Sequence, residues 1–324
     1  MDAKITKERL ANFLAYDWLK ILLSVGLVVA ILCVFFTTVR TRPRDDQNFE
    51  VYGYTGLNLG ADGYNFGDRA LKENVFSYDV LDVTTEVFDA FETYSAAAYT
   101  ARRAAGQGKI LFLSTAPMET SQVDEEGNPI MSTILEEFVK ANIITEYVES
   151  EELRQIVDFG VFMRECESYL SGVFGDWRTN DVPDEGAVRE IFLSRNANDK
   201  RFRTAAQKQV GIAEENGRLI ALRSAYLAVT AAIDRELFTL ETFTSDGGNT
   251  YTVGLNVGGN AENPESGLPA LHNFMYYNDI TEGGESVRTA KGVVVSVFNN
   301  GKHMTDLKYD TFLFLNWLME TYSA

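Results

Sequence analysis

The longest apolar run of the chain covers residues 21–39, where ILLSVGLVVAILCVFFTTV holds no charged side chain. A helix of this length spans about 29 Å, which matches a bilayer hydrocarbon core of about 30 Å. We predict one membrane-spanning helix that begins at Ile21 and ends at Val39, with Trp18 at the membrane interface. No signal-peptidase site of the A-x-A type follows the run, so the pattern favours an uncleaved signal-anchor over a cleaved signal peptide.

Basic residues flank this run on both sides, with four in residues 1–20 and three in residues 40–44. Because the two counts are nearly equal, the positive-inside rule barely favours one orientation of the helix over the other. We expect the short basic head at 1–20 to lie on the cytoplasmic side of the cell membrane and the large body to be extracytoplasmic. Residues 40–48, RTRPRDDQN, are polar and predict a short linker.

Two kinds of pattern alternate along the body at residues 49–324. Runs rich in β-branched and aromatic residues predict strands at 49–54, 75–88, 109–114, 237–244, 250–257 and 292–300. Apolar residues at helical spacing predict helices at 93–105, 132–144, 146–171, 187–236 and 309–322. At the start of the second helix, Ser132 and Glu136 resemble a capping box that is one residue out of register.

The order of these elements indicates an α/β fold. A strand, a helix and a buried strand at 75–114 form a βαβ unit, which predicts a parallel pair of strands. A long helical middle follows, and then further strands and a last helix. We therefore predict a two-lobed α/β body, in which lobe I comprises residues 49–120 and 238–324 and lobe II comprises residues 121–237.

The charge of the chain is divided unevenly. The 324 residues include 47 acidic and 29 basic side chains, a net charge of −18, which splits into +4 on residues 1–44 and −22 on the rest. An acidic body has no basic face to neutralise phosphates, so the sequence excludes general electrostatic binding of nucleic acid. Two cysteines and two histidines argue against a disulfide scaffold and a zinc centre. We predict neither a metal nor a cofactor.

Sequence motifs for catalysis are missing. The segment GQGK at 106–109 lacks the earlier glycine and the following Ser or Thr of a phosphate-binding loop, and it predicts a helix-to-strand turn instead. His272 and His303 form no metalloprotease pattern, and no G-x-S-x-G elbow occurs. The acidic clusters do not follow calcium-loop spacing and indicate solvated surface. We predict no catalytic residue.

Two segments of the body resemble a known family. In AAAYTARRAAGQGKILFLST (96–115) a helix ends in a glycine turn and leads into an apolar strand, and LEEFVKANIITEY (135–147) resembles the next helix of that family. Both are similar to the early part of extracellular solute-binding proteins of ABC transporters. The anchor followed by TRP at 41–43 resembles membrane-anchored members in Gram-positive bacteria. The resemblance implies two α/β lobes with a ligand cleft between them.

The rule for parallel α/β sheets indicates where such a ligand would bind, namely beyond the carboxyl ends of the strands. The strand ends supply four candidate ligand-binding residues, Tyr54, Thr55, Ser114 and Thr115. Three further candidates are aromatic residues of the kind that stacks on a sugar ring, namely Trp177, Tyr276 and Tyr277. The alternative for the aromatic residues is packing in the core, and for Ser114 and Thr115 it is a helix cap or a turn.

Three functions follow from these observations. The first is a non-catalytic, membrane-anchored solute-binding protein that takes a carbohydrate or peptide ligand, possible partners being a transporter permease and the lipid bilayer. The second is an interaction scaffold of the envelope or of a transporter, with another envelope protein as its partner and no small ligand. The third is an extracellular hydrolase, for which the acidic residues of the body would supply the paired carboxylates.

Overall fold

The computed structural model describes residues 7–39, 43–143, 155–245, 248–260, 263–280, 284–300 and 305–323. The chain divides into two compact units, Met1–Arg42 and Pro43–Ala324.

The first unit is built on one helix, α1 (Lys7–Val39). Its stretch from Trp18 to Phe35 has a mean hydropathy of 2.5, and none of that stretch is buried inside the protein. Among the described residues, this is the single helix that is long and apolar enough to cross a membrane. Trp18 and Ile21 therefore lie in one continuous helix that runs through the predicted span to Val39.

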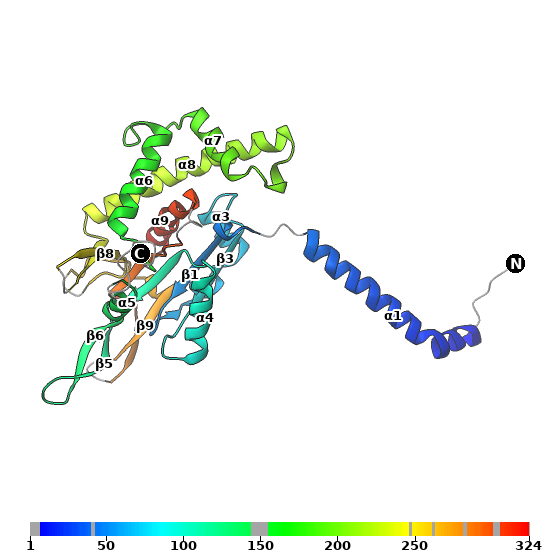
Figure 1. Cartoon of the computed structure of the whole chain (residues 1–324), viewed down its shortest axis with the longest axis horizontal. Helices are drawn as coiled ribbons and strands as arrows, with labels where there is room; N and C mark the ends of the chain where they lie inside the picture. Colours follow the sequence, from blue (N-terminus) through cyan, green and yellow to red (C-terminus); the bar gives the residue numbers. More distant parts are fainter. Residues whose placement is uncertain are drawn as a thin grey trace. The chain divides into compact units, whose positions relative to one another are not determined.

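The second unit is built on a six-stranded mixed sheet with the order β3-β1-β4-β11-β8-β7 (Figure 1). The strand bounds are β1 (Asn48–Gly53), β3 (Asp82–Val87), β4 (Ile110–Ser114), β7 (Thr239–Thr244), β8 (Thr250–Asn256) and β11 (Val293–Val297). The first three strands, β1, β3 and β4, run parallel, whereas β11 is antiparallel to both β4 and β8, and β7 is antiparallel to β8. This is a mixed α/β fold.

The two central strands, β4 and β11, are buried along their whole length. Successive side chains of a strand point to opposite faces of the sheet. Leu111 and Leu113 accordingly join one core cluster, while Ile110 and Phe112 join the other. In the sequence both strands are nearly continuous apolar runs, because both faces of the sheet are covered.

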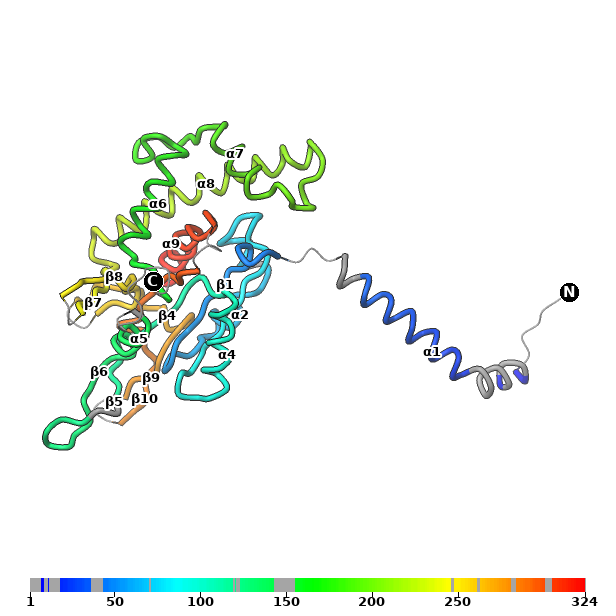
Figure 2. Tube along the Cα trace, in the orientation of Figure 1, coloured from blue at the N-terminus to red at the C-terminus, as the bar shows by residue number. Residues whose placement is uncertain are grey.

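Helices cover the two faces. Tyr99 of α4 (Thr93–Ala104) and Phe138 of α5 (Ile134–Ile143) belong to the smaller cluster on one face. The larger cluster on the opposite face holds residues of α6 (Phe159–Phe174), α8 (Ala205–Asp234) and α9 (Thr311–Tyr322). The long helix α8 packs on α9 and on α7 (Glu185–Arg195), as the trace in Figure 2 shows.

Smaller elements complete the body. Strands β2 (Asn58–Leu59), β9 (Met275–Ile280) and β10 (Ser286–Thr289) form a three-stranded sheet, and β5 (Pro117–Val123) pairs with β6 (Pro129–Thr133) in a hairpin that extends away from the central sheet (Figure 1). The short helices are α2 (Ala61–Asn65), α3 (Arg69–Val75), η1 (Asp45–Gln47), η3 (Lys200–Phe202), η4 (Leu271–Asn273) and η6 (Asp306–Asp310).

Several sequence predictions need correction. The strand predicted at 75–88 is shorter, because α3 ends at Val75 and β3 begins only at Asp82. The βαβ unit is parallel as predicted, but β1 lies between its two strands. The helix predicted at 146–171 begins at Phe159, and its residues 146–154 lie outside the described part of the chain. The hairpins β5–β6 and β9–β10 were not predicted.

The body from Pro43 to Ala324 is one compact unit, so the predicted two-lobed architecture is not confirmed. Strands from both segments of the predicted lobe I do share the central sheet, since β4 pairs with β11. The late strand β11 takes this central position because its continuous apolar run needs both helical layers for burial.

A network of buried charges crosses the interior of the body. The Arg218 guanidinium is fully buried, and its Nε donates to Asp310 Oδ1 at 2.9 Å while its Nη1 donates to Glu215 Oε1 at 2.9 Å. Arg195 donates from Nε to Asp79 Oδ2 at 2.6 Å and also bonds Glu215. These five residues come from α7, α8, η6 and the loop before β3.

The network also reaches the start of the body. Gln47 Nε2, directly before β1, donates to Asp79 Oδ1 at 3.2 Å, and Arg201 Nη2 donates to the same oxygen at 2.6 Å. Burial alone would raise the pKa of Asp79, but the guanidiniums of Arg195 and Arg201 outweigh burial and hold that pKa below its ordinary value. Asp79 is thus an anion that ties the first strand to the helical layer.

Replacing Arg218 by alanine should destabilise the body strongly, because it leaves Glu215 and Asp310 buried without their shared cation. We expect a loss of about 3–5 kcal/mol in the free energy of unfolding, measured by chemical denaturation of the full chain in detergent micelles. The control is Arg69→Ala, which removes an exposed pair with Glu73 and should leave stability nearly unchanged. Equal losses in the two variants would contradict the structural role of the network.

Candidate functional site

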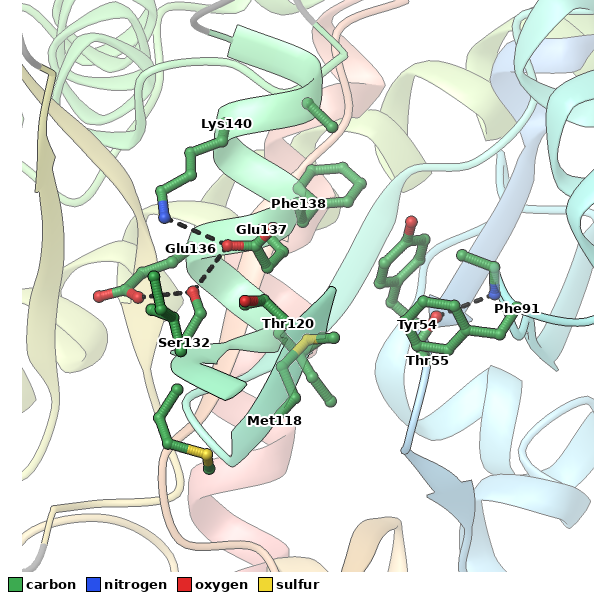
Figure 3. Close-up of a pocket in the computed structure, with 15 residues that line it drawn as sticks. Tyr54, Thr55, Phe91, Met118, Thr120, Ser132, Glu136, Glu137, Phe138 and Lys140 are labelled. Atoms are coloured by element: carbon green, nitrogen blue, oxygen red, sulfur yellow. Dashed lines mark hydrogen bonds and ion pairs between the residues drawn. The ribbon is translucent and has the colours of Figure 1, made fainter. Parts of the chain in front are cut away.

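A cavity of about 720 Å³ opens beside the carboxyl ends of β1 and β3. This is the edge at which parallel α/β sheets bind ligands. Figure 3 shows two walls, one from the residues after β1 and β3 and one from the β5–β6 hairpin and α5. The lining residues are Tyr54, Thr55, Ala90, Phe91, Met118, Thr120, Ile130, Met131, Ser132, Ile134, Glu136, Glu137, Phe138, Lys140 and Ala141.

The first wall is made by the segments that follow β1 and β3. Thr55 Oγ1 accepts a hydrogen bond from the Ala90 backbone N–H at 2.9 Å, which joins the two segments. The Tyr54 ring packs edge-on against Phe138, with 4.9 Å between ring centroids, and burial raises the pKa of its phenol. Phe91 presents an apolar side chain that is 73% exposed.

The second wall is oriented by a helix cap. Thr133 Oγ1 accepts from the Glu136 backbone N–H at 3.1 Å, and Glu136 Oε2 accepts from the Thr133 backbone N–H at 3.3 Å. This reciprocal pair is a capping box at the start of α5, with the proper three-residue spacing. The sequence prediction that Ser132 provides this cap is therefore corrected by one residue. The cap holds the first turn of α5, with Glu137, against the cavity.

Ser132 instead brings two carboxylates together. Its hydroxyl lies 2.9 Å from Glu136 Oε2 and 2.7 Å from Glu137 Oε1, and Lys140 Nζ lies 3.1 Å from the same Glu137 oxygen (Figure 3). The hydrogen bond from Ser132 lowers the pKa of Glu137, burial opposes this effect, and Lys140 adds to it. Glu137 is consequently a carboxylate anion at neutral pH, at an exposed edge of the cavity.

Apolar side chains supply most of the remaining lining. Met118, Ile130 and Met131 come from the hairpin, and Ile134 and Phe138 come from α5. Methionine adapts to irregular shapes because its side chain is unbranched and polarizable. The cavity thus combines an adaptable apolar floor with one anionic edge, an arrangement that can bind a group that is apolar in one part and cationic in another.

The lining offers little for acid–base chemistry. It contains no histidine and no cysteine, and the lowered pKa of Glu137 makes that carboxylate a weaker base. In the part of the chain that the structure describes, no three His, Cys, Asp or Glu side chains gather as metal ligands would.

The sequence predictions for ligand-binding residues divide into two groups. Tyr54 and Thr55 line the cavity. Ser114, at the end of β4, is fully buried, and Thr115 donates its backbone N–H to Gly292 O at 2.9 Å beside β11. The carboxyl end of β4 is therefore covered by the segment that leads into β11, and neither residue reaches the cavity.

The three aromatic candidates lie elsewhere. Trp177 is only 3% exposed and packs edge-on against Tyr226 in the larger core. Tyr276, on β9, lies under the Arg288 guanidinium, which is 4.7 Å from its ring centroid. Its neighbour Tyr277 is half-buried against the larger core. None of these three rings lines the cavity.

Sequence reasoning did not find the second wall. The β5–β6 hairpin was not predicted, although it places Met118 across the cavity from Phe91 (Figure 3) and adds Met131 to the lining. The available signal was the unusual closeness of methionines, isoleucines and carboxylates within residues 117–143. Another cavity, of about 680 Å³, adjoins Arg195 and Asp306, but these two charges are already paired with each other.

Removing the cap of α5 should loosen the second wall. We expect Thr133→Ala to lower the free energy of unfolding by about 1 kcal/mol, because the Glu136 backbone N–H loses its partner. Thr133→Ser keeps the accepting oxygen and should retain the stability of the parent, measured by chemical denaturation in the same detergent. If both substitutions destabilise equally, the lost methyl group and not the cap is responsible.

Comparisons with known proteins found no relative of this chain. No protein-family model, no curated protein and no solved structure matches the chain. The features that bear on function are consequently the cavity, the long apolar helix α1 and the charge of the body.

Proposed function

We propose that this protein is a non-catalytic binding protein, held at the cell membrane by α1, with its body outside the cytoplasm. It takes its ligand in the cavity beside the carboxyl ends of β1 and β3. In this proposal it resembles a membrane-anchored extracellular solute-binding protein, with a two-lobed body and an ABC transporter permease as its partner.

The cavity is the single observation that carries the proposal. Its position follows the rule for parallel sheets, and it contains Tyr54 and Thr55, which the sequence had already assigned to a ligand. Ligand sites are concave and mostly apolar, with a few polar groups that orient the ligand. Met118, Ile134 and Phe138 supply the apolar part here, and Glu137 supplies a charge.

The absence of catalysis is part of the proposal. An acyl-transfer site needs a nucleophile beside a base of suitable pKa. Ser132 has only carboxylate neighbours, and the pKa of Glu137 is lowered and not raised. This arrangement supports binding over chemistry.

A second candidate is an interaction scaffold for another envelope protein. It is favoured by the exposed apolar side chains of the β5–β6 hairpin, which include Val123, Ile130 and Met131. Exposed apolar side chains that gather on one element mark interaction sites. In this candidate the cavity is one part of a larger protein–protein surface.

Ligand binding should raise the thermal stability of the full chain, since a ligand that binds only the native state stabilises it. We expect at least one member of a panel of sugars and oligopeptides to raise the Tm in detergent micelles. The shift should be lost in Phe91→Ala and kept in Tyr64→Ala, because the two rings are 73% and 77% exposed but only Phe91 lines the cavity. A panel without any shift, or a shift that survives Phe91→Ala, would contradict the proposal.

The topology leads to a separate expectation. In right-side-out membrane vesicles, protease added outside should degrade the body and leave an epitope tag at the N-terminus intact. Detergent should then expose the tag, which provides the control for protease activity. A digested tag with a protected body would reverse the orientation and remove the extracellular part of the proposal.

A further inference from the structure

We infer that the ligand of this cavity is a basic, apolar peptide segment of a partner protein, in which an arginine flanks a large apolar residue. The inference rests on the proposed function and names the ligand class for the same site. The apolar residue would lie among Phe91, Met118 and Met131, and the arginine would bond Glu137.

The exposure of the walls argues for a ligand that is longer than a small solute. Phe91 is 73% exposed and Met131 is 58% exposed, and both line the cavity. Apolar side chains remain this accessible at sites that a second molecule covers. Val123, farther along the same hairpin, is also exposed.

The charge of the second wall argues for a cationic ligand. Residues 117–143, which form β5, β6 and α5, contain six acidic residues and one basic residue, a net charge of −5. Three of the acidic residues, Asp124, Glu125 and Glu126, are exposed at the hairpin turn. Such a wall attracts a basic segment and repels an acidic one.

Glu137 offers a defined position for the cation. Its present partners are the Ser132 hydroxyl and Lys140, and both side chains of the ion pair with Lys140 are exposed, at 39% for Glu137 and 53% for Lys140. An exposed ion pair is weak. A guanidinium binds a carboxylate through two parallel hydrogen bonds, which an ammonium cannot do, so an arginine of the ligand can replace Lys140.

The positions of the candidate aromatic residues argue against a sugar ligand. Sugar recognition relies on an aromatic platform and on many hydrogen bonds to hydroxyl groups. Trp177 is buried in the core, Tyr276 is covered by Arg288, and the Tyr54 ring is packed edge-on against Phe138. The exposed aromatic ring of the lining is Phe91, and the methionines and isoleucines of the same lining suit aliphatic and aromatic side chains of a peptide.

A peptide selection tests this inference directly. The full chain in nanodiscs of zwitterionic lipid is exposed to a phage library of random twelve-residue peptides, after depletion on empty nanodiscs. We expect the enriched sequences to place arginine within a few residues of leucine, methionine or phenylalanine. Enrichment of acidic or purely polar sequences, or no enrichment, would overturn the inference.

Variants then locate the binding of an enriched, fluorescently labelled peptide by anisotropy. Glu137→Gln and Met131→Ser should each weaken its affinity about threefold or more, whereas Lys140→Ala should strengthen it, because the competing cation is gone. The controls are Glu190→Gln, an exposed carboxylate on α7, and Val210→Ser, a side chain on α8 that is 59% exposed, and both should leave the affinity unchanged. The inference would be overturned if the control variants changed the affinity while Glu137→Gln and Met131→Ser left it unchanged.

The two proposals can fail separately. If a sugar raises the Tm in a Phe91-dependent manner and no peptide is enriched, the cavity binds a ligand but the peptide inference is wrong. If the cavity variants change the binding of neither sugars nor peptides, the proposed binding function fails together with the inference.

Discussion

The buried guanidinium of Arg218 is the constraint on which the body depends. A charge without access to water must be met by carboxylates and hydrogen bonds, and Glu215, Asp310 and Asp306 provide them. Two of these carboxylates lie about ninety residues away along the chain, directly before α9. The pairing therefore draws the last helix onto α8, and the two helices together cover one face of the central sheet.

This charge network and the candidate site lie at opposite ends of β1. The network holds the amino end, where Gln47 bonds Asp79, and the cavity opens at the carboxyl end, where Tyr54 and Thr55 follow the strand. Charge pairs fix one end of the strand, and two core clusters fix it along its length. The strand is therefore a rigid support for the side chains at its other end. We regard β1 as the element that couples the stability of the body to the geometry of the cavity.

The cavity itself combines one rigid wall with one more adaptable wall. The first wall is fixed by the Thr55–Ala90 hydrogen bond and by the aromatic packing of Tyr54. The second wall carries methionines on a two-stranded hairpin and a capped helix start with Glu137. Such a combination suits recognition of peptide segments that share charge and apolar character without sharing an exact shape. The strong negative charge of the body agrees with a basic partner segment.

The sequence alone determined the features that depend on local patterns. The apolar run gave the long helix α1, the buried runs gave β4 and β11, and helical spacing gave α4, α9 and the helical character of the segment that holds α7 and α8, because each of these follows from periodicity within one segment. It also located Tyr54 and Thr55 through the end of a predicted strand. The tertiary structure alone decided that β1 lies between β3 and β4, that Trp177 belongs to the core, and that the β5–β6 hairpin faces Phe91. These features depend on contacts between residues far apart in the chain, and neither the pairing of strands nor the partners of a buried arginine can be read from the residues next to them.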